Sequence, residues 1–225
     1  MIQNDASNKL ILVDFHVHTH YSKDSLTSPG KLLQKMGGRV DQIVITDHNT
    51  IKGAVEARKI EPEHIIIGEE IMTTKGEILA VFVQEEIPSG LEPQEVIHRL
   101  RDQHAFISVS HPFDRFRNGS WLLEDLIAIL PEIDAIEGFN ARVMTTEANR
   151  SAMKFASVHN LLITAGSDAH TTYEVGKAGI LLSEFRDTDE LRENLREGTL
   201  IARKSPWWVH IISTYAKYQK KKIKG

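Results

Sequence analysis

The chain has 225 residues, a formal net charge of −4 and no cysteine. This length fits one domain with a single sizeable core, and the apolar and charged fractions, 41% and 26%, are typical of a globular protein. Without cysteine the chain has neither disulfides nor thiolate zinc sites, so any metal must be held by imidazole and carboxylate. The negative net charge provides no overall basic field to attract nucleic acid.

No segment has the pattern of a signal peptide or a membrane helix. Residues 1–13 lack a basic start and a long apolar run, and no apolar stretch approaches the roughly 20 residues that a membrane helix needs. The sequence therefore predicts a cytoplasmic protein, with which the absence of cysteine is compatible. It does not indicate an oligomeric state.

Short apolar runs rich in Ile and Val alternate with amphipathic stretches along the chain. The runs predict strands at 10–15, 42–46, 64–72, 78–83, 106–110, 135–139, 161–165, 179–183 and 200–203. Helices are predicted between Ser28-Pro29 and Gly37-Gly38, and at 54–59, 92–104, 121–130, 146–160 and 189–198. The alternation indicates a closed or nearly closed parallel α/β barrel over residues 1–205, with a doubly wound open sheet as the alternative.

Residues 206–225 have a different character from the rest of the chain. Apolar residues at helical spacing are followed by five lysines, and these apolar residues are Trp207, Trp208, Ile211, Ile212 and Tyr215. The pattern predicts a terminal helix that packs on the barrel and ends in a solvated basic segment. The alternative is a surface that contacts RNA, DNA or anionic lipid.

Imidazole and acidic or amide groups lie at the carboxyl ends of the predicted strands. These residues are His16, His18, Asp47, His48, Glu69, Glu70, His111, Glu137, Asn140, Asp168 and His170. Active sites of barrels and open sheets are built at this edge. Because residues i and i+2 of an extended chain point to the same side, His16 pairs with His18, and Asp168 with His170. This ligand mix suits zinc, iron or manganese.

The remaining candidates are weaker. Glu69 is expected to point away from Glu70, because adjacent strand residues face opposite sides. His20 belongs to the H-x-H-x-H run but falls in a predicted loop. A surface position is expected for the other histidines, which are His64, His98, His104, His159 and His210.

Five segments, in order, resemble the motif series of the PHP family, which is named for its polymerase and histidinol phosphatase members. They are HVHTHYSKDS (16–25), TDHNT (46–50), GEEI (68–71), SHP (110–112) and GSDAH (166–170). The resemblance implies a single-domain α/β fold, a distorted (β/α)7 TIM-like barrel, with two or three divalent ions, Mn²⁺, Zn²⁺ or Fe²⁺. Residues after about 145 resemble the carboxyl-terminal segment of stand-alone PHP proteins, which argues against a fragment of a large polymerase.

The resemblance also implies a set of ligands for each ion. It assigns His16, His18, Glu70 and Asp168 to the first ion, His111 to the second, and Asp24, His48 and His170 to the third, with Glu70 bridging the first two. Asn140 stands where many relatives have a histidine ligand of the second ion. Since asparagine offers only a neutral carbonyl oxygen, that site is expected to be weak, filled by water or completed by Glu137. For Glu137, structural support and metal contact both stay open.

The family and the ligand mix together predict a hydrolase of phosphate esters acting on a small, nucleotide-like phosphomonoester. The cations would lower the pKa of a shared water to about 7, and the resulting metal-bound hydroxide would attack phosphorus. Arg142 is the first candidate for a phosphate clamp, followed by Arg115 and Arg117. Asp47 is expected to orient an imidazole. The alternatives are an oligonucleotide exonuclease or phosphodiesterase and a non-catalytic, metal-stabilised scaffold.

Overall fold

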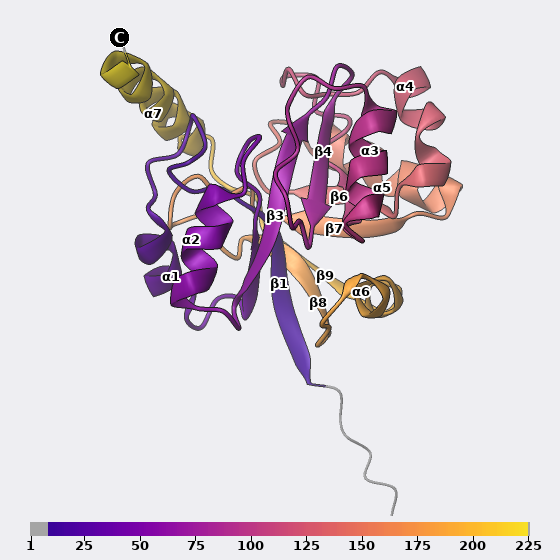
Figure 1. Cartoon of the computed structure of the whole chain (residues 1–225), viewed down its shortest axis with the longest axis horizontal. Coiled ribbons are helices and arrows are strands. Elements are labelled where there is room, and N and C mark those ends of the chain that lie inside the picture. Colours follow the sequence, from indigo (N-terminus) through magenta and orange to yellow (C-terminus); the bar gives the residue numbers. More distant parts are fainter. Residues whose placement is uncertain (1–8, 225) are drawn as a thin grey trace, which may run out of the picture.

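Nine strands form one continuous sheet in the computed structural model, which describes residues 9–224 (Figure 1). They are β1 (Leu10–Val17), β2 (Gln42–Ile45), β3 (Ile65–Met72), β4 (Glu77–Val81), β5 (Phe106–Val109), β6 (Ala135–Asn140), β7 (Leu162–Gly166), β8 (Ala178–Ser183) and β9 (Thr199–Ala202). Their order in the sheet is β7-β6-β5-β4-β3-β2-β1-β8-β9. Residues 1–8, where the sequence lacks a signal-peptide pattern, and Gly225 at the end of the predicted tail lie outside the described residues.

Helices lie beside the sheet. They are α1 (Pro29–Met36), α2 (Lys52–Ile60), α3 (Pro93–Asp102), α4 (Leu123–Ala128), α5 (Thr146–His159) and α6 (Thr188–Leu195). A further helix, α7 (Val209–Lys224), projects away from the sheet (Figure 1). Helices α1 and α2 lie together on one side of the molecule, and α3, α4 and α5 on the other (Figure 1). As the sequence predicts, α1 begins at Ser28-Pro29, and the Ser28 side chain accepts a hydrogen bond from Lys31 N.

The sheet curls until β7 meets β1. Val17 and Ala169 form a parallel bridge, and His18 N donates to the carbonyl of Ala169 at 2.8 Å. The neighbours β1, β2 and β3 run parallel, as do β5, β6 and β7. The result is a nearly closed, distorted TIM-like barrel in one α/β domain, which confirms the predicted fold class.

The expectation that all strands run parallel is wrong. β4 is antiparallel to both β3 and β5, and β8 and β9 are antiparallel to their neighbours. Only four residues separate β3 from β4, whereas a parallel crossover needs a dozen or more. The connection is a tight turn in which Gly76 N donates to Thr73 Oγ1. It places Glu77, the first residue of β4, at the edge where β3 and β5 end.

The helix predicted at 121–130 is shorter in the structure, where α4 spans Leu123–Ala128 and a 3-10 turn follows at Leu130–Glu132. Trp121 is held in the preceding loop, because its indole Nε1 donates to the carbonyl of Glu77 and its backbone N donates to the carbonyl of Pro112. The helix therefore begins only after this anchored residue.

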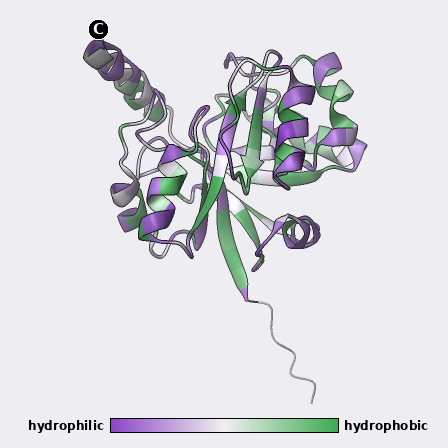
Figure 2. Cartoon of the chain, viewed as in Figure 1, coloured by the Kyte–Doolittle hydropathy of each residue, from purple (hydrophilic) through white to green (hydrophobic). Residues whose placement is uncertain are grey.

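Strand side chains divide the interior into an apolar part and a polar part. Val13, Ile43, Ile45 and Ile107 are fully buried, and the strands show green, hydrophobic segments beneath helices whose outer faces are purple (Figure 2). At the carboxyl edge the buried side chains are instead polar, with Asp168 fully buried there. Within residues 9–224, no helix has both the length and the apolar character required to cross a membrane. A cytoplasmic location stays a prediction.

Gly166 makes the closest approach between β7 and β1, which suggests a test of the barrel closure. A Cβ at this position would lie 2.2 Å from His16 Cβ and 2.8 Å from His16 N. We therefore expect Gly166→Ala to lower the free energy of unfolding by about 1–3 kcal/mol through overpacking. Gly30→Ala in α1, where an added Cβ meets nothing within 4 Å, is the control and is expected to be neutral or stabilising. Urea unfolding curves of equal midpoint for Gly166→Ala and the native chain would contradict this expectation.

Candidate metal centre

His16, His18 and Asp168 form the first of three groups that bring metal-binding atoms together. The two Nε2 atoms lie 3.0 Å apart, and Asp168 Oδ1 is 3.3 Å from His18 Nε2 and 3.7 Å from His16 Nε2. Glu70 adds Oε1 at 3.4 Å from His16 Nε2 and Oε2 at 3.5 Å from His18 Nε2. Ligands bound at about 2.1 Å around one ion are about 3.0–3.4 Å apart, so this spacing fits a single cation.

Hydrogen bonds fix the tautomers of both histidines. His16 Nδ1 lies 2.9 Å from Glu137 Oε1, and His18 Nδ1 lies 3.0 Å from Ser22 Oγ. The Ser22 hydroxyl donates its only hydrogen to Asp47 Oδ1, so it accepts a hydrogen bond from His18. Both Nδ1 atoms therefore carry protons, and two Nε2 lone pairs face each other unless a positive charge lies between them.

The second group consists of His48, Glu70 and Glu77, with His111 beside them. His48 Nδ1 is 2.8 Å from Glu70 Oε2 and 3.7 Å from Glu77 Oε1. His111 Nε2 is 3.1 Å from Glu70 Oε1 and 3.6 Å from Glu77 Oε2. Glu70 thus stands between the first group and the second, the position of a bridging carboxylate.

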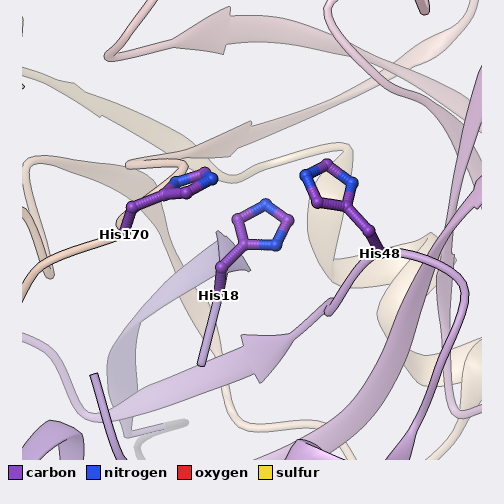
Figure 3. A group of neighbouring side chains, drawn as sticks. All are labelled: His18, His48 and His170. Atoms are coloured by element: carbon purple, nitrogen blue, oxygen red, sulfur yellow. The ribbon is translucent and has the colours of Figure 1, made fainter. Parts of the chain in front are cut away.

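The third group is a cluster of three imidazoles, His18, His48 and His170, whose rings face one another in Figure 3. The ring centroid of His18 is 4.5 Å from that of His48 and 4.3 Å from that of His170. Asp24 completes the group, with Oδ1 at 3.1 Å from His170 Nε2 and 3.5 Å from His48 Nε2. His170 Nδ1 is within 2.8 Å of the Asp168 carbonyl, which leaves Nε2 free to bind an ion.

Three carboxylate oxygens in these groups are buried without a hydrogen-bond partner among the described residues. They are Asp24 Oδ1, Glu70 Oε2 and Asp168 Oδ1, and each faces the imidazoles described above. A buried charge of this kind is costly unless it is paired or coordinates a cation. The residues present therefore fit divalent metal ions.

The electrostatics of the cluster leave Glu70 and His18 in the form that binds a cation, whereas His16 and His48 must release a proton to do so. Despite burial, the charge of Glu70 raises the pKa of both His16 and His48 well above the ordinary value. Burial alone would raise the pKa of Glu70, but charges on His16 and His48 hold it well below its ordinary value. Burial and the neighbouring His170 and His48 lower the pKa of His18 well below its ordinary value. Glu70 is thus an anion and His18 a neutral imidazole, which are the states that bind a cation.

Glu77 is the residue of the centre that sequence reasoning missed. The predicted strands at 64–72 and 78–83 leave Glu77 in the segment between them, and a parallel strand after this segment would start at the opposite end of the barrel. The short segment with Lys75-Gly76 instead forms a β-hairpin, which returns the chain to the edge where β3 ends and so brings Glu77 to the centre.

Glu137 and Asn140 lie behind the metal-binding atoms. Glu137 Oε1 accepts from His16, while its Oε2 accepts from His111 N and from the Asn140 amide, so both oxygens are occupied. The Asn140 amide also donates to Asp168 Oδ2, and its Oδ1 accepts from Arg142 N. Their contacts are those of residues that hold His16, His111 and Asp168 in place.

The predicted phosphate-binding arginines occupy three different environments. Arg117 enters the site, where Nη2 lies 2.5 Å from Asp168 Oδ2. Arg142 is buried, with Nη1 donating to both oxygens of Glu174 and Nη2 donating to Ser213. Arg115 is exposed.

The other candidates lie around the centre. Asp47 contacts His18 through Ser22 rather than holding its neighbour His48 directly. Glu69 points away from Glu70, accepts from Ile87 N, and has its pKa raised by burial to about 8. His20 belongs to none of the three groups.

Of the five histidines assigned to the surface, four are exposed, namely His64, His98, His104 and His159. The expectation is wrong for His210. This histidine is half-buried and lines the cleft in front of the metal-binding groups, because α7 carries it there.

The three groups predict that metal stabilises the fold. At a free concentration one hundred times its Kd, an ion contributes about 2.7 kcal/mol, which corresponds to a rise in Tm of roughly 5–10 °C for a chain of this size. We expect Mn²⁺ or Zn²⁺ to produce such a rise in thermal melts and a chelator to reverse it. His18→Ala, which removes a member of two groups, should lose most of the rise, whereas His98→Ala on exposed α3 should keep it. An equal rise in both variants would show that the ions bind elsewhere.

Comparisons with solved structures show the same fold. A two-domain protein from Bacteroides vulgatus containing a predicted PHP-like metal-dependent phosphoesterase aligns with a TM-score of 0.68 and 21% identity, over 87% of this chain and 65% of that one. A protein from Bifidobacterium adolescentis, presumed to be a metal-dependent phosphoesterase, aligns with a TM-score of 0.60 and 20% identity, over 83% and 96%. The lesion-specific endonuclease EndoQ of Pyrococcus furiosus aligns with a TM-score of 0.58 and 14% identity, over 85% and 58%.

Sequence comparisons agree with the motifs. Residues 146–200 match the family described as PHP-associated. An uncharacterized protein of Methanocaldococcus jannaschii is 36% identical over 177 residues, which cover 77% of this chain and 71% of that protein. Because the family match, the fold and the ordered motif residues that converge in the metal-binding groups agree, the chain belongs to the PHP family.

Proposed function

We propose that this protein is a metal-dependent phosphoesterase that hydrolyses small, nucleotide-like phosphomonoesters. The observation that carries the proposal is the set of three overlapping imidazole and carboxylate groups at the floor of one cleft. Asp24, His48, Glu77 and His170 all line this cleft. Divalent ions held by these groups would activate a water molecule and neutralise negative charge on a phosphate.

The side chains of the chain prepare this chemistry in defined ways. Ser22 and Glu137 fix the tautomers of His18 and His16, so that both Nε2 atoms are available as ligands. Arg117 lines the cleft next to Asp168, where its guanidinium is placed to contact phosphate oxygens. Arg142 also lines the cleft, and its guanidinium is held in place by Glu174 and Ser213.

The size and rim of the cleft favour a small substrate. Its volume is about 280 Å³, just below the range of roughly 300–1,000 Å³ for small-molecule sites. Phe116 and Met144, 75% and 53% exposed, lie at its edge and offer an apolar contact to the group that carries the phosphate. A nucleoside fits this combination of a charged floor and an apolar rim.

One observation favours an oligonucleotide substrate instead. The exposed side of α7 carries Tyr215 and Tyr218, and Trp207 is exposed in the turn just before the helix. Lys221 and Lys222 are exposed near its end. Aromatic side chains stack on bases, and lysines contact the phosphate backbone of single strands. Under this alternative the same centre would trim the end of a strand that lies along α7.

The proposed activity depends on the first group of ligands. We expect His16→Ala and Asp168→Ala to abolish phosphate release from every substrate, because each removes a ligand at the centre of the cluster. The measurement is phosphate release by metal-loaded protein from a panel of nucleotides, sugar phosphates and short oligonucleotides. His98→Ala, on the exposed face of α3, should retain full turnover. Near-native turnover by either ligand variant would refute the assignment, and a native protein inert toward the panel would favour the scaffold alternative.

The rim of the cleft predicts a preference among monoesters. Stacking on an aromatic side chain contributes about 1–3 kcal/mol per base. We expect Phe116→Ala to raise KM for a nucleoside monophosphate about tenfold while leaving KM for glycerol phosphate unchanged. Leu122→Ala removes another exposed apolar side chain, one that does not line the cleft, and should change neither value. An equal rise for both substrates would exclude a contact specific to the base.

A further inference from the structure

Helix α7 forms one wall of the cleft in front of the metal-binding groups. Its inner side is buried against the barrel through Val209 and Ala216, while its apolar base and purple, hydrophilic outer end are visible in Figure 2. Ser213, on the same inner side, accepts a hydrogen bond from Arg142 at 2.7 Å. The helix that the sequence presents as a tail is therefore joined to the loop that follows β6.

A second attachment joins α7 directly to the segment that carries the metal-binding residues. The Lys220 ammonium donates to the backbone carbonyl of Ser22 at 2.5 Å and also to that of His20. Both carbonyls lie between His18 and Asp24, which belong to the third group. These two hydrogen bonds fix the position of α7 relative to the loop between His18 and Asp24.

Lys217 lies on this helix, three residues before Lys220, and lines the cleft. Its ammonium is 3.4 Å from Asp24 Oδ2, and its side chain is 54% exposed. The two arginines that line the cleft have stronger ion-pair contacts than Lys217. Arg142 is buried against Glu174, and Arg117 pairs with both Asp168 and Asp114. Lys217 therefore combines access to the cleft with a single carboxylate partner among the described ion pairs.

We propose that Lys217 is a substrate-binding residue whose ammonium contacts an oxygen of the substrate's phosphate group. With Asp24 engaged by a divalent ion, the carboxylate no longer neutralises Lys217, and the flexible four-carbon stem leaves the ammonium able to turn toward an anion. Phosphate suits this position because a doubly charged group is attracted both by the ions at the floor and by an ammonium on the wall. The inference rests on the proposed function, and it adds the C-terminal helix to the substrate site.

Binding of inorganic phosphate to the metal-loaded, full-length protein tests the role of Lys217 independently of turnover. Isothermal titration calorimetry should show binding about tenfold weaker for Lys217→Ala, the effect of losing one charge-assisted hydrogen bond. Lys217→Arg, which keeps the charge, should stay within about threefold of the native affinity. The matched control is Lys154→Ala, which removes an exposed lysine of α5 that does not line the cleft, and it should bind as the native protein does. Metal content and Tm are measured for each variant, and Lys217→Gln, which keeps part of the stem, replaces an alanine variant that does not fold.

The outcomes separate this inference from the proposed function. Native affinity of Lys217→Ala, with or without a lower Tm, would overturn the inference and reduce Lys217 to an ion-pair partner of Asp24. Absence of phosphate binding by the metal-loaded native protein would overturn it as well. If phosphate binding depends on Lys217 but the native protein hydrolyses no ester, the assignment of Lys217 stands and the proposed function fails.

Discussion

The parallel bridge between Val17 and Ala169 is the contact on which the rest of the site depends. It joins the end of β1 to the segment after β7, and so brings His16 and His18 against Asp168 and His170 from the other end of the barrel. Gly166 permits the approach, since no side chain larger than hydrogen fits between β7 and His16. Closing the sheet therefore assembles the ligand set, because the ligands of β1 and those after β7 come from segments far apart in the sequence.

Closing the sheet also gathers charges that need a counter-ion. Asp24, Glu70 and Asp168 each bury an oxygen without a hydrogen-bond partner among residues 9–224. Glu137 satisfies the outer nitrogen of His16, and Ser22, itself bonded to Asp47, satisfies that of His18. The hydrogen bonds to Nδ1 fix the tautomers of His16 and His18. Their Nε2 lone pairs therefore remain available to bind a cation. Binding of a metal by these groups would therefore be coupled to folding, because the same side chains take part in both.

The cleft in front of this centre is completed from a distant part of the sequence. Helix α7 contributes His210 and Lys217 to its wall, and Lys220 ties the helix to the backbone of the loop before Asp24. On the opposite side, the segment after β5 contributes Arg117 and the exposed Phe116. Cationic side chains on two walls and apolar side chains at the rim support the proposal of a phosphorylated organic substrate, and the metal-binding groups form the floor of the cleft.

The sequence by itself determined the alternation of strands and helices, the helix start at Ser28-Pro29 and the strand-end residues of the centre, because these depend on local periodicity and short-range spacing. Strand direction, by contrast, was decided by the tertiary structure. Glu77 joins the centre because the short turn after β3 forms a hairpin. The hydrophobic pattern of a strand does not indicate whether the strand runs parallel or antiparallel to its neighbour. The tertiary structure also decided the partners of Arg142 and the position of Lys217, because both depend on where α7 packs. The residues that a side chain contacts across such long sequence distances are not determined by local spacing.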